Sequence, residues 1–179
     1  GFYFCLFNPP YTGLYGVRTT IAFQGKDSMI TRTDVEAAQA AWGTGIVHIG
    51  SADEWDIACE RAEAFIRTHY VLDGSLLFCP TKAAHQQFRP NLKSARSYFV
   101  GRDESYPEDG GFALEPWTHV RFENTGIVEL GETAIAMGNY FFTNTRGEDT
   151  KVEYTFAYVR DASGSVKIQT HHSALPYSG

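Results

Sequence analysis

The chain has 179 residues, a length that favours a single domain with a core large enough to fold without disulfide bonds. Its formal net charge is −6, and the 15 Lys and Arg residues are interspersed with 21 Asp and Glu, which argues against a nucleic-acid-binding protein. A hydrophobic content of 43% with 20% charged residues excludes an intrinsically disordered chain, and no apolar run is long enough to cross a membrane.

Aromatic residues are unusually frequent, with 13 Phe, 10 Tyr and 3 Trp making up 15% of the chain. Large rings pack well in strands and cavity walls, so this content favours a β-rich fold with a lined pocket. The three cysteines, Cys5, Cys59 and Cys79, have no metal-ligand spacing, and we predict buried, reduced thiols.

Residues 1–30 combine aromatic side chains with Pro and Gly and show no clean period, which predicts an arm or linker. Because the sequence begins at Gly1, we expect it to have been cut from a longer precursor. Residues 31–179 are predicted to form the folded domain, and they contain no internal repeat.

Two capping-box patterns predict the first two helices. Thr33 and Glu36 have the spacing of one box. Apolar residues then recur at helical intervals: Val35, Ala38, Trp42 and Ile46. Ser51 and Glu54 have the same spacing and predict a second helix that runs to about Tyr70.

The second half of the chain changes to a period of two. A short strand at 75–79 and a third helix beginning at Pro90 come first, followed by a polar loop at 101–111. Four strands are then predicted, at 118–123, 133–143, 151–159 and 165–173. Helices followed by an antiparallel meander indicate an α+β architecture.

The last predicted strand carries a polar row. Strict alternation places Gln169, His171 and Ser173 on one face and His172 on the other. Such a row needs water or a polar ligand, since unpaired burial costs a few kcal/mol. Either this face is solvated or at an interface, or His171 exchanges a proton near neutral pH while Ser173 orients water.

Metal binding and nucleophilic catalysis have weaker support. Because neighbouring side chains on a strand point to opposite faces, His171 and His172 cannot readily share an ion, and the sequence has no H-x-x-x-H or H-x-H pair. It also has no G-x-S-x-G motif and no phosphate-binding glycine loop. Arg89 is interpreted as a helix-start or ion-pair residue, and Tyr98 as a core aromatic.

Six motifs in order over about residues 33–177 form a pattern that is similar to the association-domain branch of the NTF2-like (SnoaL-like) superfamily. Specifically, the pattern resembles the ι-class carbonic anhydrases. The motifs are Phe78-Cys79-Pro80-Thr81, Phe88-Arg89-Pro90, Ser97-Tyr98-Phe99, Glu108-Asp109-Gly-Gly-Phe112, Gly138-Asn139-Tyr140-Phe141-Phe142 and His171-His172-Ser173-Ala174-Leu175-Pro176.

The resemblance implies a cone-shaped α+β barrel, in which a strongly curved antiparallel sheet wraps around helices and two copies pair as a homodimer. Relatives occur in bacteria and in algal plastids, which makes a plastid location an expectation for this chain. The departures from the family pattern are Ala174, where a second serine is common, and Cys79, where lysine is frequent.

The resemblance also implies a metal-free and cofactor-free site for hydration of CO₂ to bicarbonate. Its polar wall would consist of Thr81, Tyr98, His171 and Ser173. Thr81, Tyr98 and Ser173 would hold the water, His171 would accept or relay the proton, and aromatic rings would form a dry wall for CO₂.

Two other functions remain open at this point. An isomerase or dehydratase for a small organic acid would normally place a carboxylate inside the cone as general base, and Glu153 is predicted to point outward. A non-catalytic association module would use the cone only for oligomerisation.

Overall fold

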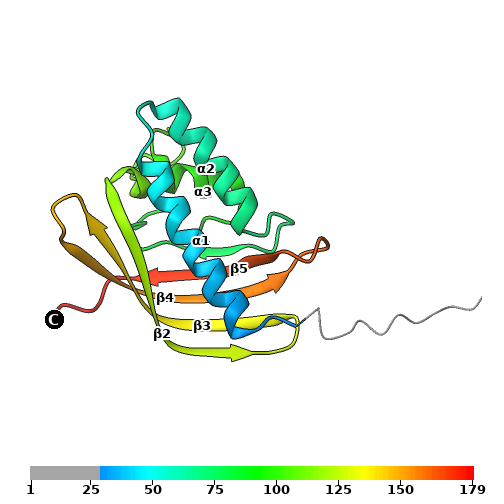
Figure 1. Ribbon diagram of the computed structural model, residues 1–179. Coiled ribbons are helices and arrows are strands. Elements are labelled where there is room, and N and C mark those ends of the chain that lie inside the picture. Colours follow the sequence, from blue (N-terminus) through cyan, green and yellow to red (C-terminus); the bar gives the residue numbers. More distant parts are fainter. Residues whose placement is uncertain (1–28) are drawn as a thin grey trace, which may run out of the picture.

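The computed structural model describes residues 29–179, so the predicted arm at 1–30 lies outside the described residues except for its last two. Three helices, α1 (Arg32–Gly50), α2 (Trp55–His69) and α3 (Leu92–Val100), lie on one side of a five-stranded sheet (Figure 1). A short 3₁₀ helix, η2 (Phe112–Leu114), precedes the long strands. The strands are β1 (Leu77–Cys79), β2 (Trp117–Glu129), β3 (Thr133–Asn144), β4 (Asp149–Arg160) and β5 (Val166–Ala174).

The sheet has the strand order β1-β5-β4-β3-β2, and β2 to β5 form the predicted antiparallel meander. The short β1 adds a parallel strand at the outer edge of β5. The α+β class and the curved sheet are therefore confirmed. The cone is open, because no hydrogen-bonded pair joins β1 to β2 within residues 29–179.

Two irregularities in strand pairing help to curve the sheet. In β2 the register shifts between Asn124 and Gly126, so Thr125 is an extra residue opposite Gly138. In β5 the pairing steps from Ile168 directly to Thr170, leaving Gln169 without a direct partner on β4. Bulges of this kind bend a strand and increase its twist.

The helix starts differ from the sequence prediction. Thr31, not Thr33, is the N-cap of α1, because its hydroxyl accepts the Asp34 N–H while the Asp34 carboxylate accepts the Thr31 N–H. The predicted box at Ser51 is also wrong: Ser51 ends α1, and its hydroxyl donates to the His48 carbonyl. Helix α2 begins after Glu54 without a side-chain cap.

Helix α3 also begins later than predicted. Asn91 is its N-cap and forms a reciprocal pair with Ser94, so Pro90 lies just before the helix. The strand predicted at 75–79 shortens to β1. The start of α2 thus moves by three residues, and the strand predicted at 118–123 extends six residues further, to Glu129. The order of the elements is as predicted.

The core is a continuous set of aromatic rings centred on Trp42 of α1. Its indole is buried, and the rings within 6.2 Å of it, centroid to centroid, come from α2 and from β2 to β5: Phe65, Phe122, Tyr140, Phe142, Phe156 and His171. The aromatic content of the sequence thus fills the space between α1 and the concave sheet, as predicted.

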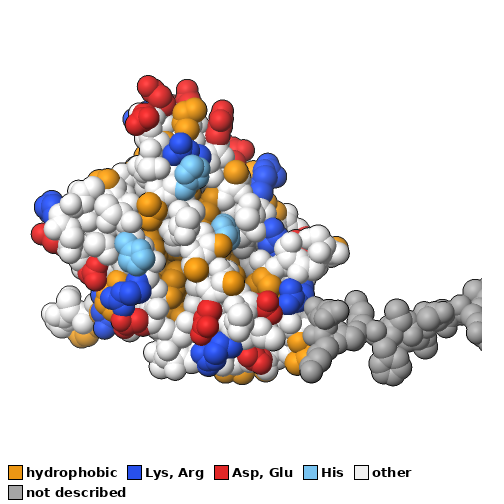
Figure 2. Space-filling view, in the orientation of Figure 1, with side chains coloured by type: hydrophobic (Ala, Val, Ile, Leu, Met, Phe, Trp, Pro, Cys, Tyr) orange, Lys and Arg blue, Asp and Glu red, His pale blue; other side chains and the backbone are white. Residues whose placement is uncertain are grey.

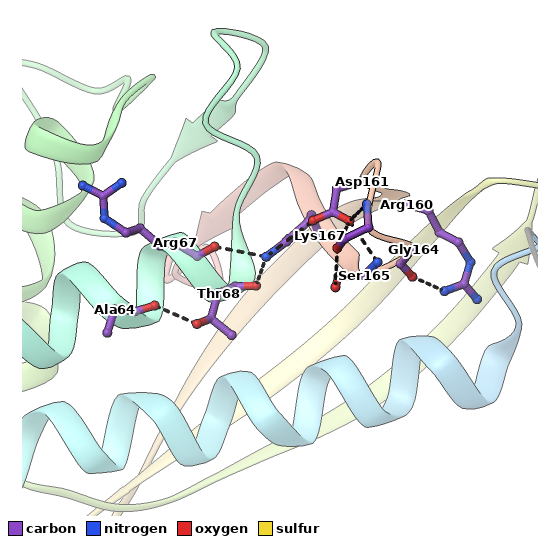
Figure 3. A network of polar contacts seen from close by, with 9 residues as sticks. Ala64, Arg67, Thr68, Arg160, Asp161, Gly164, Ser165 and Lys167 are labelled. Atoms are coloured by element: carbon purple, nitrogen blue, oxygen red, sulfur yellow. Dashed lines mark hydrogen bonds and ion pairs between the residues drawn. The ribbon is translucent and has the colours of Figure 1, made fainter.

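The carboxyl end of α2 is fastened to β5 by Lys167 (Figure 3). The Lys167 ammonium donates to the carbonyls of Arg67 at 3.0 Å and Thr68 at 2.6 Å, which the helix itself leaves without partners. Tyr70 follows directly, and the next N–H, of Val71, donates to the Ile168 carbonyl at 3.0 Å. The chain segment that carries Tyr70 is therefore fixed against β5.

The loop between β1 and α3 is held by Glu108. Its carboxylate accepts three backbone N–H groups, from Ala84 at 2.7 Å, His85 at 2.9 Å and Gln86 at 2.8 Å. These hydrogen bonds hold the pKa of Glu108 down at about 2, since they favour the charged form. The clamp restrains the loop that contains Thr81.

The buried Arg89 adds a second restraint to the same loop. Its guanidinium donates to Asp109 at 2.7 Å and stacks over the Tyr106 ring at 4.4 Å, while its backbone N–H donates to the Phe78 carbonyl. Asp109 also accepts the Ser97 hydroxyl of α3 at 2.5 Å. The ion-pair interpretation of Arg89 is confirmed, and the pair joins the loop to α3.

On the face shown in Figure 2, acidic and basic side chains are scattered, and no continuous basic stripe is visible. Among residues 29–179, no helix is both long and apolar enough to cross a membrane.

The β2 bulge requires glycine at position 138. A Cβ there would lie 2.1 Å from the Glu123 carbonyl oxygen and 2.8 Å from the Thr125 nitrogen, which are backbone atoms that cannot rotate away. We expect Gly138→Ala to lower the free energy of unfolding by about 1–3 kcal/mol, the usual scale of overpacking. Gly126→Ala, which would meet no atom within 4 Å, is the matched control. Equal urea midpoints for the two variants would contradict this account.

The Glu108 clamp has a defined pH range. Because the pKa of Glu108 is lowered from 4.5 to about 2, the clamp is at full strength above about 4.5 and is lost as the pH falls through about 2. The amide proton shifts of Ala84, His85 and Gln86 should therefore titrate with a midpoint near 2. Glu108→Gln should abolish this titration and Glu104→Gln should retain it. A midpoint near 4.5 in the wild type would contradict the clamp.

Candidate active site

The four residues predicted for the site line one small cavity inside the cone. Thr81 comes from the loop after β1, Tyr98 from α3, and His171 and Ser173 from β5. The space open to the centre of a water molecule is about 10 Å³, enough for roughly one water. The remaining lining residues are Tyr140, Trp42, Phe78, Pro80, Phe99 and Phe112. The cavity thus has a hydroxyl-rich side and an aromatic side.

The polar row on β5 is shorter than predicted. His171 and Ser173 are buried and face the cavity, whereas Gln169 is half-buried and donates from its amide to the Ser75 hydroxyl at 3.1 Å. The bulge at Gln169 shifts the alternation, so Ile168 shares the inner face with His171. The assignment of Gln169 to the row was therefore wrong.

The His171 ring is enclosed by rings and hydrogen-bonded at both nitrogens. Its Nδ1 lies 2.9 Å from the Tyr70 hydroxyl, and its Nε2 lies 2.7 Å from the Ser173 hydroxyl. The rings of Phe78 and Phe156 lie 4.5 Å and 4.2 Å from it, centroid to centroid. Burial lowers the pKa of His171 well below its usual range, so the imidazole is neutral near pH 7.

Sequence reasoning missed two tyrosines of this site. The Tyr140 hydroxyl pairs with the Ser173 hydroxyl and lies 3.4 Å from His171 Nε2. The alternation of β3 could have identified Tyr140, because it shares the inner face with Phe142. Tyr70 lies just beyond the end of α2, and no periodicity places its side chain.

Tyr98 lies at the outer end of the cavity. Burial raises the pKa of its phenol well above the usual range, opposed by hydrogen bonding to the Thr81 side chain and the Lys82 backbone. Burial likewise raises the pKa of Tyr140, opposed by hydrogen bonding to Ser173 and Thr81. Both tyrosines are therefore neutral hydrogen-bonding groups at physiological pH.

A polar vestibule lies next to the cavity and shares Tyr98 and Phe112 with it. These two rings stack with centroids 5.5 Å apart and an interplanar angle of 14°. The vestibule has a volume of about 360 Å³, and its charged lining residues are Lys82, Glu108, Asp109 and Glu115. The stacked pair therefore borders both the cavity and a charged, solvent-exposed hollow.

Other candidate groups lie away from the cavity. Cys59 and Cys79 are free and half-buried, a correction to the predicted full burial, and desolvation raises the pKa of both thiols. Cys5 lies outside the described residues. In the described part of the chain, no three His, Cys, Asp or Glu side chains are grouped so that they could hold a metal ion.

Carboxylates are likewise absent from the described lining of the cavity. Glu153 is exposed on the outer face of β4, as predicted. The geometry therefore offers no inward Asp or Glu of the kind that the isomerase or dehydratase alternative requires.

Comparison with known proteins places this geometry in a family. The family model of metal-independent carbonic anhydrases matches residues 33–175. A metal-independent carbonic anhydrase from Nostoc sp. strain PCC 7120 is 40% identical over 156 residues, covering 83% of this chain and 75% of the relative.

Comparison with solved structures also identifies a carbonic anhydrase as similar to this chain. The crystal structure of an iota-carbonic anhydrase from a cyanobacterium, complexed with bicarbonate, has a TM-score of 0.83 at 40% identity and covers 85% of this chain and 96% of that one. A candidate ketosteroid isomerase from Parabacteroides distasonis has a TM-score of 0.52 at 15% identity, covers 86% and 98%, and shares the fold alone. From the matched sequence and the matched structure together, this chain belongs to the metal-independent carbonic anhydrase family.

Proposed function

We propose that this protein catalyses the reversible hydration of CO₂ to bicarbonate, with water polarised by side chains. The observation that carries the proposal is the meeting of Thr81, Tyr98, His171 and Ser173, from three separate parts of the chain, around one cavity with an aromatic wall. The family relationship and the bicarbonate in the cyanobacterial relative support it.

The two sides of the cavity suit the two reactants. CO₂ has no net dipole and fits against the rings of Phe78, Phe99 and Phe112. The hydroxyls of Thr81, Tyr98 and Ser173 hold the attacking water. Because the cavity has room for about one water, the second reactant requires lining side chains to move, and we expect this of Tyr98 and Phe112, which also line the vestibule.

The reaction forms a bond from the water oxygen to the carbon, and one proton leaves. Negative charge develops on the carbon dioxide oxygens, and preorganised hydroxyl donors stabilise it without reorganisation of solvent. The proton passes to solvent through the vestibule beside Tyr98, where Lys82 and acidic side chains meet the water. Bicarbonate leaves by the same route.

Removal of single hydroxyls tests the assignment. We expect Tyr98→Phe and Ser173→Ala each to lower kcat for CO₂ hydration by about 10²–10³-fold, the usual loss for one transition-state hydrogen-bond donor. Tyr158→Phe, a change at a buried tyrosine that does not line the cavity, is the control. Rates are measured by stopped flow after exhaustive chelation. Unchanged rates in both site variants would refute the site, and activity lost to chelator and restored by zinc would refute the metal-free mechanism.

We also propose that two copies pair through the outer face of the sheet. An antiparallel sheet packed on one side normally has a polar outer face, but here the register places Val128, Ile135 and Met137 together on it. These side chains are 57%, 38% and 56% exposed. The adjacent hollow, about 340 Å³ and lined by Met137 and His172 among others, extends the same surface. A second copy of this chain would cover this apolar surface.

The plastid location stays a prediction.

Introducing a charge into this face tests the pairing. Met137→Glu should convert a dimer to a monomer in light scattering, because a buried carboxylate without a partner is costly. Leu130→Glu, at an equally exposed position in the turn before β3, is the control and should remain dimeric. A wild type with the mass of a monomer would refute the proposed dimer.

A further inference from the structure

A buried chain of hydrogen bonds extends from α1 to the cavity through residues outside the assigned site. The Trp42 indole nitrogen lies 2.9 Å from the Tyr70 hydroxyl, which lies 2.9 Å from His171 Nδ1. His171 Nε2 lies 2.7 Å from the Ser173 hydroxyl, which pairs with Tyr140. All five side chains are at least 95% buried, so each polar hydrogen needs a partner within the chain or the cavity.

The direction of the first two hydrogen bonds follows from what each group can donate. An indole nitrogen only donates, so the Tyr70 oxygen accepts from Trp42. The hydrogen of Tyr70 must then be donated elsewhere, and its other hydrogen-bond partner in the described residues is His171 Nδ1. Nδ1 is therefore an acceptor and carries no hydrogen.

The protonation state of the His171 ring follows from these two hydrogen bonds. If Nδ1 were protonated, it would donate to Tyr70, and the Tyr70 hydrogen would be buried without an acceptor. The imidazole is thus neutral with its hydrogen on Nε2, consistent with the burial that lowers the pKa of His171. The Nε2–H group then donates to the Ser173 oxygen.

We infer that Tyr70, oriented by Trp42, is a positioning residue that holds His171 as a hydrogen-bond donor to Ser173, so that the site presents a hydroxyl proton to the substrate. This inference rests on, and deepens, the proposed CO₂ hydration at this cavity. It changes the role predicted for His171, from acceptor or relay of the proton to orientation of Ser173.

The number of polar hydrogens in this set of groups exceeds the number of hydrogen bonds that join them by one. The five groups carry five polar hydrogens, one each from Trp42, Tyr70, His171, Ser173 and Tyr140, and four hydrogen bonds join them in sequence. Four hydrogens fill these bonds, and the fifth, a hydroxyl hydrogen of the Ser173–Tyr140 pair, lies on the cavity side, where Thr81 also hydrogen-bonds to Tyr140. That hydrogen can donate to an oxygen of CO₂ or of bicarbonate.

The direction of these hydrogen bonds, from Trp42 toward Ser173, cannot easily be reversed. For His171 to take a proton at Nε2, its neighbours would have to turn their hydrogens toward α1, where the Trp42 N–H cannot accept one. The backbone around Tyr70 opposes movement as well, because Val71 and Lys167 fasten this segment between α2 and β5. The arrangement is therefore preorganised to stabilise developing negative charge.

The tautomer is measured directly in the full chain labelled with ¹⁵N-histidine. Two-bond ¹H–¹⁵N spectra of the wild type, with the His171 signals identified by their loss in His171→Asn, should show Nε2 protonated and Nδ1 unprotonated. Because this readout uses the wild type, it does not depend on how any variant folds. A doubly protonated ring near pH 7, or one protonated at Nδ1, would overturn the inference.

Tyr70→Phe tests the positioning role. It removes one hydroxyl and keeps the ring packed against Phe78, so we expect a mixture of His171 tautomers. We expect kcat to fall about tenfold, the lower end of the loss typical when the hydrogen-bond partner of a metal-bound histidine is removed. Tyr158→Phe should change neither readout. A single unchanged tautomer in Tyr70→Phe would overturn the role of Tyr70. A wild type with the expected tautomer but no CO₂ hydration would refute the proposed function and leave the hydrogen-bond assignment supported.

Discussion

The structure depends on the burial of one imidazole and its hydrogen-bond partners inside an aromatic core. Leaving any of these groups unpaired would cost the protein about 1–3 kcal/mol, so their donors and acceptors must match. The partners come from α1, the end of α2, β3 and β5, and the helices and sheet can pack closely only when all of them are in place. One constraint therefore fixes both the packing of the core and the chemistry of the cavity.

Much of the fold could be predicted from the sequence because its signals are local. The period of two in β2 to β5 and the helical spacing of Val35, Trp42 and Ile46 gave the correct elements in the correct order. The boundaries moved where several capping residues compete within a few positions, as at Thr31 and Thr33. A sequence pattern shows that a cap is present, whereas the hydrogen bonds of the folded chain decide which residue provides it.

The residues of the candidate site likewise fall into those that a local pattern could identify and those that it could not. His171 and Ser173 could be placed on one face because side chains alternate along a strand. The bulge at Gln169 reverses this alternation for the residues before it, and such a bulge depends on the pairing with β4, which the sequence does not show. Tyr70 could not be found, because its place beside His171 results from the meeting of a helix end with a distant strand. Arg89 and Glu108 belong to the motifs identified in the sequence. Their role in holding the loop of Thr81 could not be predicted, because it depends on contacts between segments that are separate in the chain.

The small size of the cavity has a consequence for selectivity. A space of about 10 Å³, bordered by the stacked rings of Tyr98 and Phe112, admits a ligand larger than one water only when its lining side chains move. A linear triatomic molecule is close in size to this space, whereas an aryl ester is much larger than it and would require the aromatic wall and the core around Trp42 to repack. The same packing that stabilises the fold therefore limits which molecules reach Ser173, so discrimination by size is built into the core of the protein.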